Sequence, residues 1–269
     1  MKLISTHGKR QLSLRAKVKL RRQLRYWVPA TVVALTICLL ALTGPGQSML
    51  AAANAKPLPI YCVDTGVEKR ACLTFDAAWG NEDTQLLIDI LGQYNVKATF
   101  FVVGEWVDKY PESVKALHDA GHEIMNHSAD HAHFSKLSPD QIIHDITLCN
   151  EKIAAVTGVM PTLFRPPYGD YNDRVINTVN GMKIYPIQWS VDSLDWKNPG
   201  SDAIVQRVLE KTEPGSIVLF HNAAPDTPGA LPAIIERLQS QGYHLVKVSD
   251  LIYTENYTID HTGKQHSAG

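Results

Sequence analysis

The residues of this chain that are best suited to chemistry are two histidines four positions apart, His127 and His131, in the run His-Ser-Ala-Asp-His. Two imidazoles at this spacing can face one metal ion from a single helical turn. A bound divalent ion lowers the pKa of a water molecule and polarises a carbonyl group, and both effects serve amide hydrolysis. Two histidines at this spacing are more often ordinary surface residues than ligands, so the metal interpretation depends on the rest of the chain.

Four other runs contain further candidates for hydrolytic chemistry. They are Leu-Thr-Phe-Asp-Ala-Ala-Trp-Gly at 73–80, Arg-Pro-Pro-Tyr-Gly at 165–169, Asp-Ser-Leu-Asp-Trp at 192–196 and Leu-Phe-His at 219–221. Together they offer groups that can accept a proton from water, stabilise charge and return a proton to a leaving amine. Each run alone also has an ordinary structural interpretation, such as a helix cap, a packing ion pair or a turn.

In this order the five motifs resemble those of the polysaccharide deacetylases, the NodB-like enzymes of carbohydrate esterase family 4 that remove N-acetyl groups from chitin and peptidoglycan sugars. The resemblance extends over roughly residues 70–250. It implies that Asp76 is the general base and His221 the general acid, with Arg165 beside Asp76 and Asp195 beside His221. A carboxylate next to arginine stays ionised and an imidazole next to a carboxylate keeps its proton near neutral pH, so this division is physically sensible.

The same resemblance assigns the remaining site residues. His127 and His131 would bind a divalent metal, for which zinc suits two imidazoles best and cobalt or nickel also fit. The backbone N–H of Tyr168 would help to stabilise the oxyanion, and Trp196 and Leu219 would wall the pocket for the acetyl methyl group. The implied partner is an N-acetylated cell-wall glycan, either peptidoglycan or a chitin-like polymer, with another N-acyl compound as an alternative.

Ala77 is the one departure from the family pattern. The first motif usually reads Phe-Asp-Asp, and its second Asp is a metal ligand, whereas a methyl group cannot bind a metal. Three outcomes follow from the resemblance. A third ligand comes from water, from Asp130 or from an acid in 81–83; or metal binds only weakly; or metal and activity are both lost. The last outcome leaves a catalytically silent carbohydrate-binding or scaffold protein.

A subgroup of the family, the sporulation-associated PdaB-like proteins, reads Phe-Asp-x-x-Trp-Gly at the first motif. This chain resembles that subgroup there and again in Asp-Trp-Lys-Asn-Pro-Gly at 195–200. The resemblance makes Ala77 a trait of the subgroup rather than damage. The leading hypothesis is therefore an exported deacetylase that acts on cell-wall sugars during spore formation.

Strand-like and helix-like stretches alternate along most of the chain. Hydrophobic pattern and capping signals predict strands at 71–76, 98–103, 122–126, 163–165, 183–189, 216–221 and 244–246, and helices at about 84–91, 112–120, 139–157, 172–180, 201–211 and 231–241. Strands that alternate with helices over about 200 residues are typical of one α/β domain with a largely parallel sheet.

The positions of the motifs favour a barrel over an open sheet. Asp76, His127, Arg165, Asp192 and His221 each fall at or just past the carboxyl end of a predicted strand. Barrels gather catalytic groups from several strands at that face, whereas an open sheet gathers them only at a switch point. The resemblance likewise implies the family's irregular (β/α) barrel.

Charge divides the chain into a basic start and an acidic remainder. Residues 1–55 contain nine basic residues and no acidic one, which leaves 17 basic and 27 acidic residues, a formal charge of −10, for the other 214. An acidic domain excludes non-specific nucleic-acid binding, which needs clustered cations. We expect a basic cytoplasmic tail at 1–26, an apolar signal or anchor at 27–43, a linker at 44–59, the catalytic domain at 60–254 and a polar, frayed tail at 255–269.

The apolar segment predicts export. Its length is near the lower limit of about 17–25 residues for a membrane span. The pattern fits both a retained membrane anchor and a secretory signal with a cleavage site after Ala55. In either case the positive-inside rule leaves the basic end in the cytoplasm and sends the domain outward, with the membrane as a partner of the N-terminal segment.

Two cysteines raise the question of a disulfide bridge. Cys62 and Cys72 lie in short β-like runs at 59–63 and 71–75, which could pair as a hairpin. In an exported protein a bridge between such strands can form, and two reduced, small apolar residues are the alternative. Cys149 falls in a helical pattern and is expected in the core.

Overall fold

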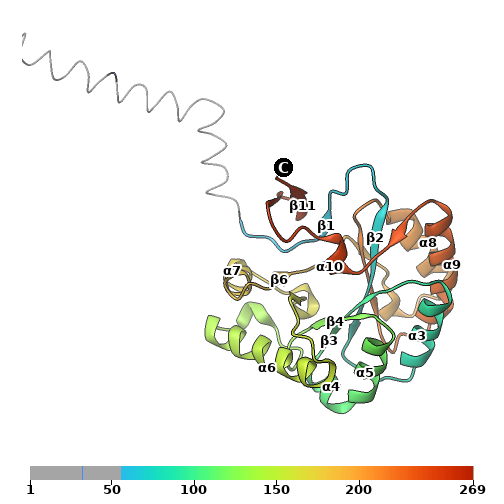
Figure 1. Ribbon diagram of the computed structural model, residues 1–269, viewed down its shortest axis with the longest axis horizontal. Coiled ribbons are helices and arrows are strands. Elements are labelled where there is room, and N and C mark those ends of the chain that lie inside the picture. The colour runs from blue at the N-terminus through green and yellow to red at the C-terminus, as the bar shows by residue number, and fades with distance from the viewer. Residues whose placement is uncertain (1–31, 33–55, 269) are drawn as a thin grey trace, which may run out of the picture. The chain divides into compact units, whose positions relative to one another are not determined.

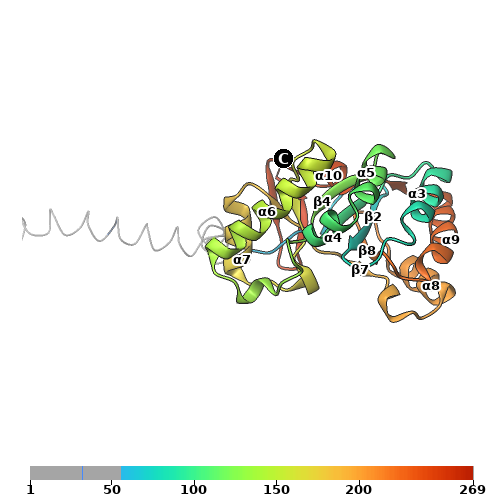
Figure 2. The same cartoon turned by 90° about the horizontal axis from the view of Figure 1, so that it is seen from below.

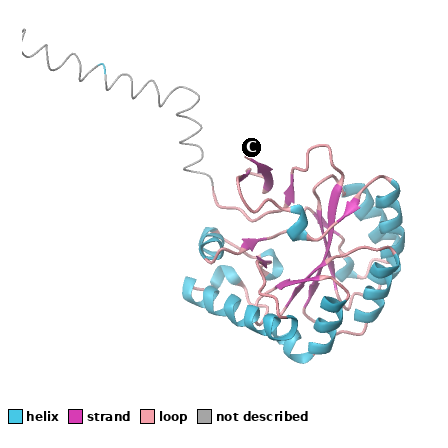
Figure 3. Cartoon of the chain, viewed as in Figure 1, coloured by secondary structure: helices cyan, strands magenta, loops and turns pink. Residues whose placement is uncertain are grey.

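The centre of the fold is a parallel sheet of short, buried strands (Figures 1 and 3). Its strands are β2 (Arg70–Ala77), β3 (Thr99–Val102), β4 (Glu123–Asn126), β5 (Leu163–Phe164), β6 (Tyr185–Pro186), β7 (Val191–Asp192), β8 (Ile217–His221) and β9 (His244–Leu245). They run in the order β6-β5-β4-β3-β2-β8-β7, with β9 paired to the start of β2. Strands β2 and β8 are almost continuously apolar and buried, as expected for parallel strands covered on both faces.

The connection between β6 and β7 shows that this sheet is curled. The two strands lie at opposite ends of the strand order, yet only residues 187–190 separate them in sequence. So short a link reaches no more than about 18 Å, so the two edges must approach each other. The backbone N–H of Ile187 donates to Phe164 and that of Ser190 donates to Ile217, one contact at each edge. The barrel expected from the sequence is thus an α/β fold with a half-barrel of parallel strands.

Helices form the outer layer of the domain (Figures 1 and 2). They are α3 (Thr84–Gln93), α4 (Gly104–Lys109), α5 (Pro111–Asp119), α6 (Pro139–Thr157), α7 (Asp173–Gly181), α8 (Ser201–Lys211), α9 (Thr227–Ser240) and the short α10 (Val248–Leu251). The predicted capping box of α6 is present, because Ser138 and Gln141 bond to each other's backbone N–H groups. Gly158 ends α6 in the left-handed conformation that favours glycine. Helices α8 and α9 lie side by side in both views.

The C-terminal residues form strands, so the expectation of a frayed tail is wrong. Strands β10 (Tyr257–Ile259) and β11 (Lys264–Ser267) are antiparallel, and β11 also pairs in parallel with β1 (Cys62–Val63). Strand β1 pairs with β11 and not with β2, so the hairpin that the two β-like runs could have formed is not present. Cys62 and Cys72 are free thiols, which was the alternative to the bridge, and Cys149 is buried in the core as predicted.

The structure describes residue 32 and residues 56–268. The predicted basic tail, almost all of the apolar segment and most of the linker lie outside these residues. Within the described part of the chain, no helix has the length and apolar character needed to cross a membrane. The domain boundaries at the N-terminal side therefore stay predictions.

Gln265 provides a test of the C-terminal sheet. Its buried side chain accepts a hydrogen bond from the backbone N–H of Tyr253 at 2.8 Å and donates one to the Tyr253 carbonyl at 2.6 Å. We expect Gln265→Ala to lower the free energy of unfolding by about 1–3 kcal/mol, because two hydrogen bonds to the backbone of the half-buried Tyr253, each contributing about 0.5–1.5 kcal/mol, are lost. Urea denaturation measures this, with Gln206→Ala on the exposed face of α8 as the control. Equal stability of the two variants would contradict this role of Gln265.

Candidate active site

Asp76 and Arg165 form a buried ion pair at the carboxyl ends of β2 and β5. The Arg165 Nη1 group donates to Asp76 Oδ1 at 2.7 Å and to Thr74 Oγ1 at 2.9 Å, and Nη2 donates to the Gln188 carbonyl at 3.1 Å. The guanidinium also stacks on the Phe101 ring, 4.1 Å from its centroid. Burial raises the pKa of Asp76, but the neighbouring positive groups, Arg165 first, outweigh it and hold the pKa below its usual value. Asp76 is therefore ionised at neutral pH, as a general base must be.

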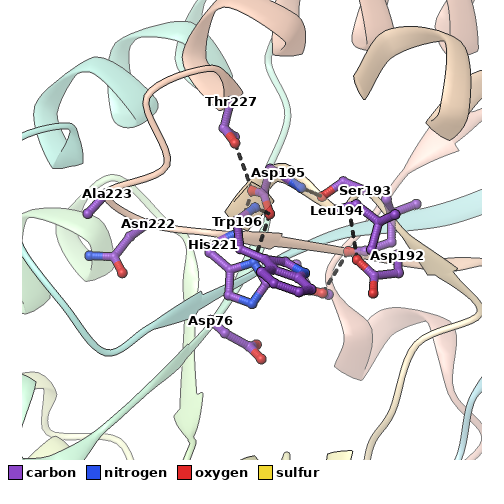
Figure 4. A network of polar contacts seen from close by, with 12 residues as sticks. Asp76, Asp192, Ser193, Leu194, Asp195, Trp196, His221, Asn222, Ala223 and Thr227 are labelled. Atoms are coloured by element: carbon purple, nitrogen blue, oxygen red, sulfur yellow. Dashed lines mark hydrogen bonds and ion pairs between the residues drawn. The ribbon is translucent and has the colours of Figure 1, made fainter. Parts of the chain in front are cut away.

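His221 faces the same site from the next strand. It is the register partner of Asp76 across β2 and β8, although 145 positions separate the two residues in sequence. Asp195 Oδ1 lies 2.8 Å from His221 Nδ1, and Asp195 Oδ2 accepts the His221 backbone N–H at 2.8 Å (Figure 4). Burial lowers the pKa of His221, but Asp195 more than compensates, and the pKa lies above its ordinary value. The Asp195 contact places a proton on Nδ1, so Nε2 is the nitrogen that exchanges a proton with a ligand.

Asp195 is held by more partners than the sequence indicated. Besides His221, it accepts hydrogen bonds from the Trp196 backbone N–H at 2.8 Å and from Thr227 Oγ1 at 2.7 Å (Figure 4). Thr227 begins α9, lies in no recognisable motif and has no signal that would have pointed to it. Asp192, which had no assigned role beyond structural support, accepts the Leu194 N–H and also lines the cavity.

His127 and His131 lie close together, but on an irregular loop and not on the helical turn that their spacing suggested. Ser128 and His131 have positive φ values of 77° and 62°. The loop is anchored to α6, because Asp145 accepts the Ala129 N–H at 2.8 Å. The two imidazole centroids are 5.1 Å apart. Burial lowers the pKa of both rings, that of His131 to about 4, so both are neutral at pH 7.

Two features of these histidines suit a metal. His127 Nδ1 lies 2.7 Å from the Arg165 carbonyl and so carries a proton, which leaves a lone pair on Nε2, 3.4 Å from Asp76 Oδ2. His131 Nδ1 is buried without a hydrogen-bond partner among the described residues. Two neutral imidazoles and a nearby carboxylate make the kind of donor set that divalent ions prefer.

The protein does not complete the metal site, however. Ala77 is buried in the apolar core, and no group of three or more His, Cys, Asp or Glu side chains within residues 56–268 is arranged to hold a metal. Asp130 contacts Asp145 instead, and Asp83 accepts the Ala223 N–H. The other acid in 81–83, Glu82, lies against Gly80. The side chains proposed as substitutes thus do not fit, and we assign no reaction step to a metal.

A cavity of about 460 Å³ joins these groups. It is lined by every predicted site residue except the deeply buried pair Arg165 and Asp195; the lining residues are Asp76, Ala78, Trp79, His127, His131, Tyr168, Trp189, Asp192, Trp196, Leu219 and His221. A volume of this size is within the usual range for small-molecule sites of about 300–1,000 Å³. The predicted wall residues Trp196 and Leu219 and the predicted oxyanion donor Tyr168 all line this cavity, and their roles stay predictions; Trp79 and Trp189 were not foreseen as lining residues.

Comparison with known proteins gives one family throughout. The model of the polysaccharide deacetylase family matches residues 64–187. A peptidoglycan-N-acetylglucosamine deacetylase of Bacillus cereus is 38% identical over 190 residues, which cover 69% of this chain and 89% of that protein. The peptidoglycan-N-acetylglucosamine deacetylase PgdA of Listeria monocytogenes is 38% identical over 74% of this chain, and the matched region spans only 41% of PgdA.

Solved structures add a different kind of relative. BA3943 of Bacillus anthracis, described as a pseudoenzyme of carbohydrate esterase family 4, matches with a TM-score of 0.70 and 35% identity over 80% of this chain and 74% of its own. A mutant of BA3943 described as having restored enzymatic activity matches with a TM-score of 0.71 and 37% identity, covering 75% of this chain and 74% of its own. Both active and inactive relatives thus share this fold.

The Asp195–His221 pair gives a prediction about proton affinity. We expect Asp195→Asn to lower the pKa of His221 by about 1 or more, because the variant loses the negative charge that favours the imidazolium. NMR titration of the imidazole nitrogens measures the change. Asp192→Asn is the matched control, since Asp192 contributes least of the carboxylates that raise the pKa of His221. A larger effect of the control than of Asp195→Asn would refute the assignment.

Proposed function

The chain belongs to the polysaccharide deacetylase family, whose members are hydrolases, and from that premise we propose that it removes N-acetyl groups from sugars of cell-wall glycans, with peptidoglycan as the favoured polymer. The observation that carries the proposal is the pair of oppositely tuned groups in one cavity. Arg165 holds the pKa of Asp76 below its usual value, and Asp195 holds the pKa of His221 above its usual value. An ionised base and a protonated acid that face one ligand are what amide hydrolysis needs.

In the proposed reaction, Asp76 accepts a proton from a water molecule whose oxygen attacks the acetyl carbonyl carbon. The oxyanion that forms is stabilised by the backbone N–H of Tyr168, which is held at φ 61° at the cavity wall. His221 then donates a proton from Nε2 to the amide nitrogen as the C–N bond breaks. The products are acetate and the free amine of the sugar. Arg165 keeps Asp76 oriented through its three hydrogen bonds.

A second candidate function follows from Ala77. Deacetylases of this family are generally metal-dependent, and this chain supplies two of the three expected protein ligands. The pseudoenzyme relative supports a glycan-binding protein without turnover as the alternative. Both candidates place an N-acetylated sugar in the same cavity, and they differ only in whether acetate is released.

We also propose that the domain acts outside the cytoplasm, either anchored in the membrane or released after cleavage near Ala55, and that it serves spore formation. The support is the basic and apolar N-terminal sequence and the resemblance to the PdaB-like subgroup. A peptidoglycan substrate agrees with this location, because the polymer lies beyond the membrane that such a segment enters.

Acetate release decides between the two candidates. We expect the purified protein to release acetate from peptidoglycan or N-acetylglucosamine oligomers, and Asp76→Asn to reduce the rate by roughly 10²–10⁴-fold, because the general base is lost. An enzyme-coupled acetate assay measures both, with and without added zinc. If the protein binds glycan but releases no acetate either with or without zinc, the silent glycan-binding protein is the correct candidate.

Restoring the missing carboxylate tests the metal site directly. We expect Ala77→Asp to be less stable than the natural protein without metal, because it buries an unpaired charge, and to be stabilised by zinc, which binds the folded state. Acetate release with zinc should rise about 100-fold, in line with the several kcal/mol that a bound ion provides. Thermal unfolding and the acetate assay measure these effects. Ala77→Asn, equal in size but uncharged, is the control, and an equal response of both variants would contradict the idea.

A further inference from the structure

Three large aromatic side chains are exposed at the cavity. Trp79, Tyr168 and Trp196 keep 66%, 60% and 56% of their surface accessible to solvent, although each also lines the cavity. Large apolar side chains that gather in the open at one site usually mark a binding surface. Tyr168 already has a role as the oxyanion donor and Trp196 as a predicted wall of the acetyl pocket, whereas Trp79 has none.

The backbone that carries Trp79 is unusually well fixed for an exposed loop. Asn222 accepts the Ala78 N–H at 3.3 Å and donates to the Gly80 carbonyl, so it bonds to the residues on both sides of Trp79. The Trp106 indole donates to the same Gly80 carbonyl at 2.9 Å. Because Asn222 directly follows His221, the loop of Trp79 is tied to the strand end that carries the general acid. The indole is therefore presented in a defined place without being buried.

Trp79 and Trp196 lie beside different functional groups of the cavity. The Trp79 ring lies 6.0 Å from the ring of His131, centroid to centroid, and thus adjoins the histidine pair. Trp196 follows Asp195, the partner of His221, and so adjoins the acid. A sugar whose N-acetyl group enters between Asp76 and His221 therefore has exposed aromatic surface both near the histidine pair and near the acid.

The chemistry of these surfaces suits neutral sugar rings. A pyranose in a β-linked glycan has a face of C–H groups with slight positive charge, which pairs with the negative face of an aromatic ring. The lining includes Asp76 and Asp192 but no lysine or arginine, so it favours an uncharged ring.

Resting on the proposed function, we infer that Trp79 stacks against the sugar next to the one whose N-acetyl group enters the cavity. The ligand is then an internal segment of a glycan strand and not a single sugar. Trp79 is a specificity-determining residue that adds affinity for oligomers and leaves the acetyl pocket itself unchanged.

Binding measurements with sugars of different length test this inference. The full chain and its Trp79→Ala and Trp79→Phe variants are titrated by calorimetry or NMR with N-acetylglucosamine and with its β-1,4-linked tetramer. We expect Trp79→Ala to weaken tetramer binding roughly tenfold, to weaken monomer binding far less and to be largely rescued by Trp79→Phe. Leu86→Ala on α3 removes another exposed apolar side chain, outside the cavity lining, and should change neither affinity.

The outcomes separate this inference from the proposed function. Natural protein that binds the tetramer more tightly than the monomer, with the same preference in Trp79→Ala, overturns the role of Trp79 alone. Equal losses for monomer and tetramer in Trp79→Ala overturn it as well, because they indicate a general disturbance of the pocket. Natural protein that binds neither sugar overturns both this inference and the proposed function.

Discussion

The buried ion pair between Arg165 and Asp76 is the interaction on which the rest of the structure depends. Arg165 has no exposed surface, and a buried charge is tolerated only where its partner and its hydrogen bonds are supplied together. Those partners come from β2 and from the link between β6 and β7. The arrangement of strands that holds the guanidinium is therefore the same one that places Asp76, His127 and His221 around a single cavity.

The site combines a complete proton-transfer apparatus with an incomplete metal site. Asp76 accepts a hydrogen bond from Arg165 at 2.7 Å, and Asp195 lies 2.8 Å from His221 Nδ1. The histidines, in contrast, are neutral and leave a buried nitrogen of His131 without a partner among the described residues. Relatives described as deacetylases and one described as a pseudoenzyme share the fold, so the fold alone does not decide turnover. Turnover depends instead on the groups that surround the imidazoles of His127 and His131.

Much of the fold and of the site could be predicted because local signals and motifs coincide. Strand-forming runs ended at Asp76, Arg165 and His221, and parallel strands bring such ends to one edge. What failed depended on distant pairing. The β-like run around Cys62 carries no mark of its partner, which is β11 at the other end of the chain. The polar C-terminal residues looked unstructured because their order comes from side chains such as Gln265, not from apolar periodicity.

The short link between β6 and β7 also bears on how the protein folds. It can take its place only when strands from both ends of the sheet, β5 and β8, are already in position, since it bonds to one strand at each edge. Contacts between such distant parts of a chain form slowly. Arg165 donates one of its hydrogen bonds to the Gln188 carbonyl in this link. A folding intermediate with an uncurled sheet would therefore have the strands and helices of the domain but no assembled site, so burial of Arg165 and assembly of the cavity should lag behind recovery of secondary structure during refolding.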